Sequence, residues 1–483
     1  MFLFDYEVSR FISILNLILV ICVIFWGRNR SSRSTVMWVM VVSSFPIIGF
    51  IAYLLIGADT RRTNMFRLKE SQDDIIREMT AQQVEELEQG SDMLLGPNFD
   101  DYNELATFAL KVDHSVLTFN NRCRLFFNGP DKFEALIQDI DRAQESIMIQ
   151  YYIMKSDEIG HRVMNHLIEA VERGVRVRLL IDGFGSRYIR DRDIRWMKRQ
   201  GIEVATFFPS FFKHINLRLN YRNHRKIVII DGYIGYLGGF NVGDEYMGKK
   251  KRFGYWRDTH LRIEGEGSAS LAIRFLQDWY YASGQDPEEE PEIEVRASQG
   301  GNIAMQLITS GPDTTYHNIK YAMIKMIVSA NHSIYIQTPY LVPDTTFLDT
   351  LLLAINQGVE VNIMIPNKPD HPIIYWATTS YAGELLRHGA KLYRYEKGFL
   401  HAKVMIIDDY LSMVGSANLD ERSFSLNFEA SEIIYSYEVN MDLREQFELD
   451  MADSTLITPE IYGQRSLAQR IKEPVARLFS PLL

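Results

Sequence analysis

Two short stretches of this chain carry histidine, lysine and asparagine at identical intervals, following the pattern H-x-K-x4-D-x6-G-[GS]-x-N. An imidazole can act as nucleophile, acid or base, while ammonium and amide groups donate to the oxygens of an anion. Two such sets in one pocket would suit attack on a phosphodiester. The first copy comprises His224, Lys226, Asp231, Gly239 and Asn241. The second copy comprises His401, Lys403, Asp408, Ser416 and Asn418.

The spacing predicts that each copy is a strand that enters the core and ends in a turn. Side chains at i and i+2 of a strand share one face, so the histidine and lysine of each copy point the same way. Four apolar residues follow each lysine, and Asp231 and Asp408 stand at the strand ends, where a turn begins. The small residues beyond them let backbones approach closely, and each asparagine can return an amide to the same pocket.

The two copies lie inside a longer repeat of the sequence. Residues 146–154 resemble residues 333–341, and residues 173–182 match residues 357–366. In the second pair a glycine stands where a helix would end and a strand begin. Strands alternating with helices predict an α/β fold of two similar lobes. We expect each lobe to hold a mostly parallel sheet flanked by helices, and the lobes to pack about a pseudo-twofold axis.

Two apolar runs near the N-terminus predict a transmembrane helical hairpin. The spans cover about residues 8–26 and 35–57, and crossing a bilayer takes roughly 20 residues. A cleaved signal peptide fits less well, because no small-residue cleavage site follows the first run. Basic residues flanking the hairpin outnumber those in its turn. This bias favours a multi-pass protein of the cell membrane whose catalytic body is cytoplasmic.

The chain beyond the hairpin, which ends near residue 60, divides into four further segments. We predict a helical linker over 61–111, a first lobe over 112–285, an inter-lobe linker over 286–300 and a second lobe over 301–483. The second lobe ends in a helix within 466–483, which would lie either on the membrane surface or on the body. The basic run 249–252 is either a solvated loop or a contact for anionic headgroups.

Composition narrows the classes of protein that the chain can belong to. The 483 residues are 46% hydrophobic and 24% charged, which is typical of a globular protein with an ample core. Two cysteines cannot build a disulfide framework or a zinc cluster. A net charge of −10 argues against a dedicated nucleic-acid-binding protein.

The duplicated motif resembles that of the phospholipase D superfamily. Similarity to the bacterial cardiolipin synthases within it extends to longer strings, which include NLRLNYRNHRK, GGFNVGDEY, YWRDTHLRIEG, IMIPNKPDH and GSANLDERSF. Together with the two N-terminal apolar runs, the resemblance covers essentially the whole chain. It implies two phospholipase D-like lobes that share one active site.

The resemblance implies a two-step phosphatidyl transfer that needs no metal and no other cofactor. One histidine attacks a phosphatidylglycerol and forms a phosphohistidine, while the other protonates the departing glycerol. The second histidine then activates the terminal hydroxyl of another phosphatidylglycerol, which gives cardiolipin. Family members imply that His224 is the nucleophile and His401 the acid and base, although the sequence itself does not order them.

The resemblance also implies roles for the other residues of the site. It assigns a carboxylate to each histidine, and we expect Glu429 to orient His401 and Asp258 to orient His224. Asp231 and Asp408 belong to the catalytic motif, yet a structural role at the turn and the lobe interface fits them better. The residues expected to hold phosphate oxygens are Lys226, Lys403, Asn241 and Asn418. Ser416 and Gly239 belong to the same pocket, and Gly239 replaces the serine that is usual in the superfamily, so one half lacks a hydroxyl donor.

Several alternatives remain open from the sequence. The same residues would serve a phospholipase D that hydrolyses lipids to phosphatidic acid, or a phosphatidyltransferase with another alcohol acceptor. A nuclease of the same superfamily is disfavoured by the net charge and the membrane runs. A scaffold without activity is disfavoured by two intact motifs. The expected partners are phosphatidylglycerol and the lipid bilayer, not nucleic acid, and the sequence leaves the oligomeric state open.

Overall fold

The computed structural model describes residues 2–26, 32–54, 70–89, 102–209, 221–286, 293–314 and 316–480. Parts of the predicted segments lie outside these residues. In the predicted hairpin they are its turn at 27–31, its end at 55–60 and most basic residues used to orient it. In the rest of the chain they are linker residues 61–69 and 90–101, first-lobe residues 210–220, inter-lobe residues 287–292, and second-lobe residues 315 and 481–483.

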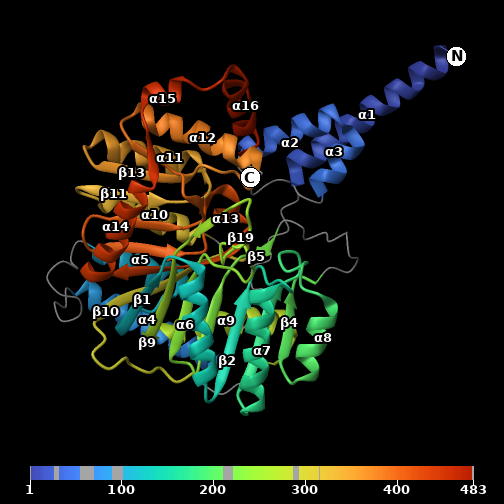
Figure 1. Cartoon of the computed structure of the whole chain (residues 1–483). Coiled ribbons are helices and arrows are strands. Elements are labelled where there is room, and N and C mark those ends of the chain that lie inside the picture. Colours follow the sequence, from blue (N-terminus) through green and yellow to red (C-terminus); the bar gives the residue numbers. More distant parts are fainter. Residues whose placement is uncertain are drawn as a thin grey trace.

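Three helices form the described N-terminal part and extend from the two lobes (Figure 1). They are α1 (Phe2–Trp26), α2 (Ser32–Ser44) and α3 (Pro46–Ala52). They pack through a small cluster that includes Val23, Trp38 and Tyr53. Pro46 begins α3, so the second apolar run forms two helices where we expected one. Within the described residues, no helix combines the length and the apolar character that crossing a membrane requires.

Two further helices precede the first lobe, namely α4 (Glu70–Glu88) and α5 (Asn103–Asp113). The first lobe is built from β1 (Thr118–Phe126), α6 (Gly129–Arg142), β2 (Ser146–Tyr151), α7 (Glu158–Glu172), β3 (Arg176–Asp182), α8 (Asp191–Arg199), β4 (Glu203–Phe207), β5 (Arg222–Asn223), β6 (Ile227–Ile230), β7 (Ile234–Gly238), β8 (Tyr255–Arg257), β9 (His260–Gly265) and α9 (Gly267–Ser283).

The second lobe repeats this order. Its elements are β10 (Ile303–Ser310), α10 (Asn318–Ser329), β11 (Ser333–Gln337), β12 (Leu341–Val342), α11 (Thr345–Asn356), β13 (Glu360–Pro366), α12 (Pro372–Arg387), β14 (Lys391–Tyr395), β15 (Gly398–Leu400), β16 (Val404–Ile407), β17 (Leu411–Gly415), β18 (Leu419–Asp420), α13 (Glu421–Ser425), β19 (Asn427–Tyr435), α14 (Tyr437–Ala452), β20 (Ser454–Ile457), α15 (Pro459–Gly463) and α16 (Leu467–Leu478).

One continuous sheet runs through both lobes. Its strand order is β20-β14-β13-β11-β16-β17-β19-β10 in the second lobe and β1-β9-β7-β6-β2-β3-β4 in the first. Read outward from the β1–β10 pair, the two halves have matching strands, with β20 added at one edge. The prediction of two similar α/β lobes related by a pseudo-twofold axis is therefore confirmed, and the axis passes between β1 and β10.

The prediction that each sheet is mostly parallel is wrong. In the first lobe β2, β3 and β4 are parallel, but β2–β6, β6–β7, β7–β9 and β1–β9 are antiparallel pairs. The reason is the motif itself, because the turn at Asp231 folds β6 back onto β7 as a hairpin. Asp231 has φ 51° and its counterpart Asp408 has φ 46°, a left-handed conformation that aspartate tolerates better than most residues.

Both faces of the sheet are covered. Ile227 and Ile229 of β6 enter a core cluster with α9, whereas Val228 and Ile230 enter a cluster with α6 and α7. The cluster on the α9 side also contains residues of α14, so it joins the two lobes. This burial on both sides explains why the motif strands are apolar without alternation.

Helices outside the repeat complete the second lobe. Leu105 and Leu110 of α5 are buried in its core, together with residues of α10 and α11. The C-terminal helix α16 packs against α12, where Arg477 forms an ion pair with Glu384. Of the two interpretations of this helix, docking on the body is therefore confirmed.

Candidate active site

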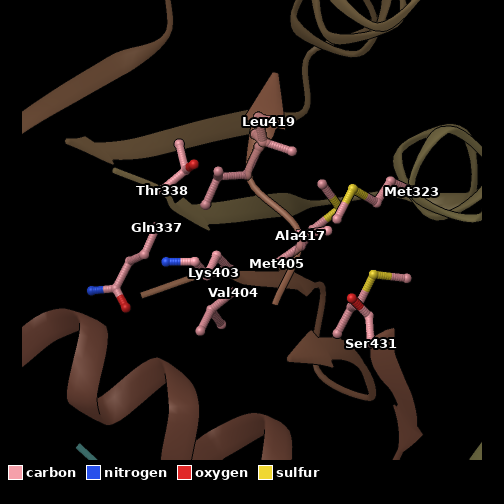
Figure 2. A pocket seen from close by; sticks show the side chains of 11 residues that line it. Met323, Gln337, Thr338, Lys403, Val404, Met405, Ala417, Leu419 and Ser431 are labelled. Carbon is pink, nitrogen blue, oxygen red and sulfur yellow. The ribbon is translucent and has the colours of Figure 1, made fainter. Parts of the chain in front are cut away.

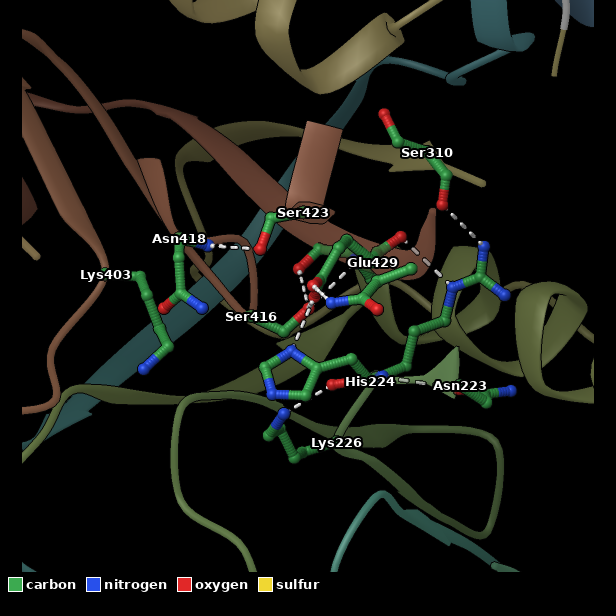
Figure 3. Close-up of polar contacts among 12 residues, drawn as sticks. Asn223, His224, Lys226, Ser310, Lys403, Ser416, Asn418, Ser423 and Glu429 are labelled. Atoms are coloured by element: carbon green, nitrogen blue, oxygen red, sulfur yellow. Dashed lines mark hydrogen bonds and ion pairs between the residues drawn. The ribbon is translucent and has the colours of Figure 1, made fainter. Parts of the chain in front are cut away.

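The first motif histidine stands between strands of different lobes. β5 pairs in parallel with β19, and the backbone N–H of His224 donates to the carbonyl oxygen of Phe428 over 2.9 Å. The ring Nδ1 lies 2.9 Å from Oε2 of Glu429, while the other ring nitrogen points away from that carboxylate (Figure 3). A carboxylate can only accept, so Nδ1 carries the proton and Nε2 keeps its lone pair.

The second motif histidine repeats the arrangement. β15 pairs in parallel with β8, and the backbone N–H of His401 donates to the carbonyl oxygen of Arg257 over 2.7 Å. Its Nδ1 lies 2.6 Å from Oδ2 of Asp258. Both imidazoles are therefore held as the same tautomer, each with a lone pair on Nε2.

Each histidine contacts a carboxylate of the other lobe. We expected Glu429 to contact His401 and Asp258 to contact His224, and both pairings are wrong. The short strands β5 and β15 leave their own lobes to pair with strands of the opposite one. Glu429 lies on β19 and Asp258 directly follows β8, so the two lobes exchange their carboxylates across the pseudo-twofold axis.

The two motif lysines are buried beside the imidazoles. Nζ of Lys226 donates to the carbonyl oxygen of His224, and Nζ of Lys403 donates to that of His401. Burial lowers the pKa of Lys226 to about 7 and that of Lys403 to about 8, despite the attraction of Glu429 and Asp258. An anion bound between them would raise both values and keep both lysines charged.

The imidazoles are neutral in the unliganded site. Burial lowers the pKa of His224 to about 4. The attraction of Glu429 opposes this shift, but burial together with the like charges of Lys226 and Lys403 outweighs that attraction. The pKa of His401 is lowered by burial and by Lys403, whose Nζ lies 2.9 Å from Nδ1. A neutral imidazole with a free Nε2 is the form that can attack phosphorus.

The carboxylates behind the histidines stay ionised although they are fully buried. Burial raises the pKa of Glu429, but the opposing effects of His224 and Lys226 are larger, so the pKa is lowered overall. The pKa of Asp258 is lowered in the same way, because His401 and Lys403 outweigh its burial. Each histidine therefore faces a charged acceptor that can stabilise an imidazolium during the reaction.

The two asparagines differ in what their amides contact. Oδ1 of Asn241 accepts from the backbone N–H of Ile153, and its Nδ2 donates to the Tyr246 hydroxyl over 3.0 Å. Oδ1 of Asn418 is buried without a hydrogen-bond partner among the described residues. Figure 3 shows the Asn418 side chain beside Lys403. Both amide atoms of Asn241 are thus engaged, whereas the amide oxygen of Asn418 could accept a hydrogen bond from a substrate hydroxyl.

The serine and glycine of the two motifs serve the carboxylates. The Ser416 hydroxyl donates to Oε2 of Glu429 and accepts from the backbone N–H of Ala430. At Gly239 an added Cβ would lie 1.9 Å from Oδ1 of Asp258, so a side chain there would displace that carboxylate. Gly239 therefore lacks the hydroxyl of the usual serine, and the space beside its Cα is occupied by the carboxylate of Asp258.

The motif aspartates lie at the far ends of their strands from the histidines. Asp231 accepts hydrogen bonds from the backbone N–H groups of residues 144, 145 and 146, and Asp408 from those of residues 331, 332 and 333. Asp231 stands five positions after Lys226, a rise of roughly 16 Å along a strand. The structure therefore gives them no catalytic contact. Their bonds stay within one lobe, so the expected role at the lobe interface is wrong while the role at the turn is confirmed.

Two aromatic side chains line the imidazoles. The ring of Tyr152 meets that of His224 edge to face with centroids 4.9 Å apart, and Trp256 lies 5.2 Å from His401. From the sequence, these aromatic residues were expected either in the core or in the wall of the pocket. Tyr152, just after β2, and Trp256, within β8, belong to the wall.

Buried ion pairs behind the site also escaped the sequence analysis. Arg225, between His224 and Lys226, donates to both carboxylate oxygens of Asp278 on α9. Arg257 of the first lobe donates to Asp450 on α14 of the second. The sequence repeat could have indicated these ion pairs, because its strings at β2 and β11 each contain a glutamine. Gln150 and Gln337 donate to the same two aspartates.

A small cavity lies behind Lys403 (Figure 2). Its lining includes Gln337, Thr338 and Met405. The space of about 10 Å³ holds roughly one water molecule, which is too little for a phosphodiester or an organic cofactor.

One cluster of potential metal ligands is found among the described residues. It consists of Asp141, His166 and Glu169 on the outer helices α6 and α7. Nδ1 of His166 lies 2.6 Å from Oδ1 of Asp141, so direct contact between these side chains explains why the cluster forms. None of its members belongs to the motifs.

Together these residues form a site for substitution at a phosphodiester. It offers two imidazoles, each backed by an ionised carboxylate, and two ammonium groups for the oxygens of the anion. One imidazole can attack phosphorus while the other transfers protons.

Comparison with protein families gives two matches. Residues 136–259 and 323–451 match the model described as cardiolipin synthase, PLD-like domain, so each lobe is matched separately. Residues 14–57 match the model described as phospholipase D-nuclease N-terminal.

Curated relatives match over almost their whole length. A cardiolipin synthase of Oceanobacillus iheyensis is 46% identical over 97% of this chain and 98% of the relative. The major cardiolipin synthase ClsA of Bacillus subtilis is 45% identical over 97% of this chain and 98% of the relative. Among solved structures, phosphatidylserine synthase of Haemophilus influenzae has a TM-score of 0.60 at 11% identity, covering 79% of this chain and 100% of that one. At that identity the likeness shows the fold alone.

Proposed function

The chain belongs to the cardiolipin synthase family of the phospholipase D superfamily, and we propose that it transfers a phosphatidyl group between two phosphatidylglycerol molecules. The products are cardiolipin and glycerol. The observation that carries the mechanism is the pair of imidazoles backed by carboxylates of opposite lobes.

In the first step, Nε2 of His224 attacks the phosphorus of the donor lipid. A bond between nitrogen and phosphorus forms, and the bond from phosphorus to the glycerol oxygen breaks. The glycerol oxygen takes its proton from His401. That histidine is neutral in the unliganded site, so the bound phosphodiester must first raise its pKa, as a nearby negative charge does.

In the second step, His401 accepts the proton of the terminal hydroxyl of another phosphatidylglycerol. The new oxygen–phosphorus bond forms while the nitrogen–phosphorus bond breaks, and His224 regains its lone pair. One phosphodiester replaces another, so the reaction is near balance and reversible.

The charge of the phosphoryl group is met by Lys226, Lys403 and the amide of Asn418. Two ammonium groups can stabilise the developing charge as a metal would elsewhere. We propose that the transfer proceeds without metal. We also propose His224 as the nucleophile, because burial lowers its pKa to about 4 and so keeps its imidazole neutral.

We further propose that the N-terminal helices anchor the enzyme in the cell membrane as a hairpin, with the two lobes in the cytoplasm. The match of residues 14–57 to an N-terminal family model supports membrane association. So do exposed apolar side chains on these helices, of which Leu17, Ile48 and Phe45 are examples. Contact with the bilayer would keep lipid hydroxyls, rather than water, next to the site.

The experiment that tests the function uses purified full-length protein in mixed micelles with labelled phosphatidylglycerol and excess EDTA. Thin-layer chromatography should show cardiolipin and released glycerol in equal amounts. Phosphatidic acid alone would indicate hydrolysis. Activity that disappears with EDTA and returns with a divalent ion would overturn the metal-free mechanism.

A further inference from the structure

The product constrains where the second substrate binds, if the proposed function holds. In cardiolipin two phosphodiesters are joined by a single glycerol. When the terminal hydroxyl of the acceptor reaches the phosphohistidine, the acceptor's own phosphodiester therefore lies one glycerol length away, just outside the pair of imidazoles. That second anion needs cationic partners other than the two motif lysines.

Two guanidinium groups share one aromatic ring near His224. Cζ of Arg187 lies 4.6 Å from the ring centroid of Phe184, and Cζ of Arg222 lies 4.4 Å from it. Phe184 is 43% exposed and Arg187 is exposed, whereas Arg222 is buried, so Arg187 is the guanidinium that borders solvent. The ring faces favour cations and hold two like charges together.

The loop that carries Phe184 and Arg187 is tied to the motif strand. Asp182 at its start accepts hydrogen bonds from the backbone N–H groups of Phe184 and Asn223. Asn223 directly precedes His224, so the loop and the nucleophile share one anchor. The position of Arg187 relative to the active site is thus set by the backbone.

The same loop touches the aromatic wall of the site. An added Cβ at Gly185 would lie 2.5 Å from the ring of Tyr152, so loop and ring are in close contact. That ring is the one whose centroid lies 4.9 Å from the centroid of His224. One tyrosine ring therefore separates the loop from the nucleophile.

Burial lowers the pKa of Arg222, and the like charge of Arg187 adds to this effect against the attraction of Asp182. An anion bound on the exposed side of Arg187 would offset that like charge.

The side of the site around His401 carries charges of both signs. The Tyr340 hydroxyl donates to the carboxylate of Asp370, which attracts Lys403. Arg252 donates to the backbone carbonyl oxygen of Asp370. A second phosphodiester would meet the Asp370 carboxylate there.

We propose that Arg187, with Arg222, binds the phosphodiester of the acceptor lipid and so selects an anionic lipid as acceptor. Bound there, the lipid directs its terminal hydroxyl at the phosphohistidine. The hydroxyl oxygen bonds to phosphorus, the bond to Nε2 of His224 breaks, and the proton passes to His401. An uncharged alcohol would undergo the same step without using the arginines.

The test compares two acceptors with the same donor. Full-length Arg187→Gln protein is assayed for cardiolipin formation, and for exchange of labelled free glycerol into phosphatidylglycerol. The ratio of cardiolipin formation to glycerol exchange should fall about tenfold, the loss expected for one charge-assisted contact. Arg187→Lys should recover part of the ratio, because it keeps the charge.

The matched control is Arg190→Gln, which removes an exposed arginine three residues further along the chain. Its ratio should equal that of the wild type. Equal loss of both activities in Arg187→Gln would overturn the proposal, since the arginine would then serve the donor or the fold. An unchanged ratio would overturn it as well. A wild-type protein that makes no cardiolipin would instead refute the proposed function.

Discussion

Asp258 of the first lobe lies 2.6 Å from Nδ1 of His401 in the second. The reciprocal contact, between Glu429 and His224, has a distance of 2.9 Å. The chemistry of each imidazole therefore depends on the opposite lobe. A change in one lobe should affect the histidine of the other, and this dependence can be measured.

The carboxylate variants should separate the two half-reactions. With a phosphatidyl nitrophenol donor, whose leaving group needs no acid, Asp258→Asn should still release one equivalent of nitrophenol and then stall. Glu429→Gln should lose that burst, because His224 would lack its acceptor. We expect turnover to fall about 10²- to 10⁴-fold in each. A stopped-flow burst in Glu429→Gln but not in Asp258→Asn would contradict the exchange between lobes.

The pH dependence of the reaction should follow the groups that shift. His224 attacks as the neutral base, so kcat/KM should fall as pH drops towards its pKa of about 4. Lys226 and Lys403 bind as cations, so kcat/KM should also fall as pH rises through about 7 to 8. A bound anion raises the lysine pKa values, and the alkaline limb of kcat should lie at higher pH than that of kcat/KM. Coincident limbs would argue against the lysines as the titrating groups.

The inequality between Gly239 and Ser416 should appear in their variants. Gly239→Ser puts atoms where Asp258 now lies, so we expect at least about a hundredfold loss of turnover. Ser416→Gly removes one hydrogen bond to Glu429 and should reduce turnover about tenfold. Rates measured beside melting temperatures would separate chemistry from folding. Equal losses of turnover in the two variants would mean that the space beside Gly239 is not needed to hold Asp258 in place.

The aspartates at the strand ends should affect stability rather than chemistry. Asp231→Asn keeps a residue that tolerates positive φ but weakens the bonds to three backbone N–H groups. We expect the free energy of unfolding to fall by about 1–3 kcal/mol, measured by urea denaturation. Turnover per folded molecule should remain close to that of the wild type. A large loss of turnover in a stably folded variant would restore a catalytic role to Asp231.

The sequence was sufficient for the motif residues and the repeat, because both depend on local spacing. It did not predict that the sheet is mixed, since a pattern of apolar runs does not give strand direction. The partners of Glu429 and Asp258 were also missed. Sequence distance favours the nearer histidine, whereas pairing between β5 and β19 and between β8 and β15 is a long-range contact. Arg257 and Asp450 escaped for the same reason, because 193 residues separate them.

The exchange of carboxylates also bears on how such a chain could arise. A single lobe holds a histidine without its acceptor and an acceptor without its histidine, so alone it would be inert. Two copies related by a twofold axis would complete each other. An ancestor of half this length would therefore have worked only as a dimer. Fusion of two such copies into one chain would let the halves diverge, and the glycine at position 239, where the second lobe has Ser416, is one difference of that kind.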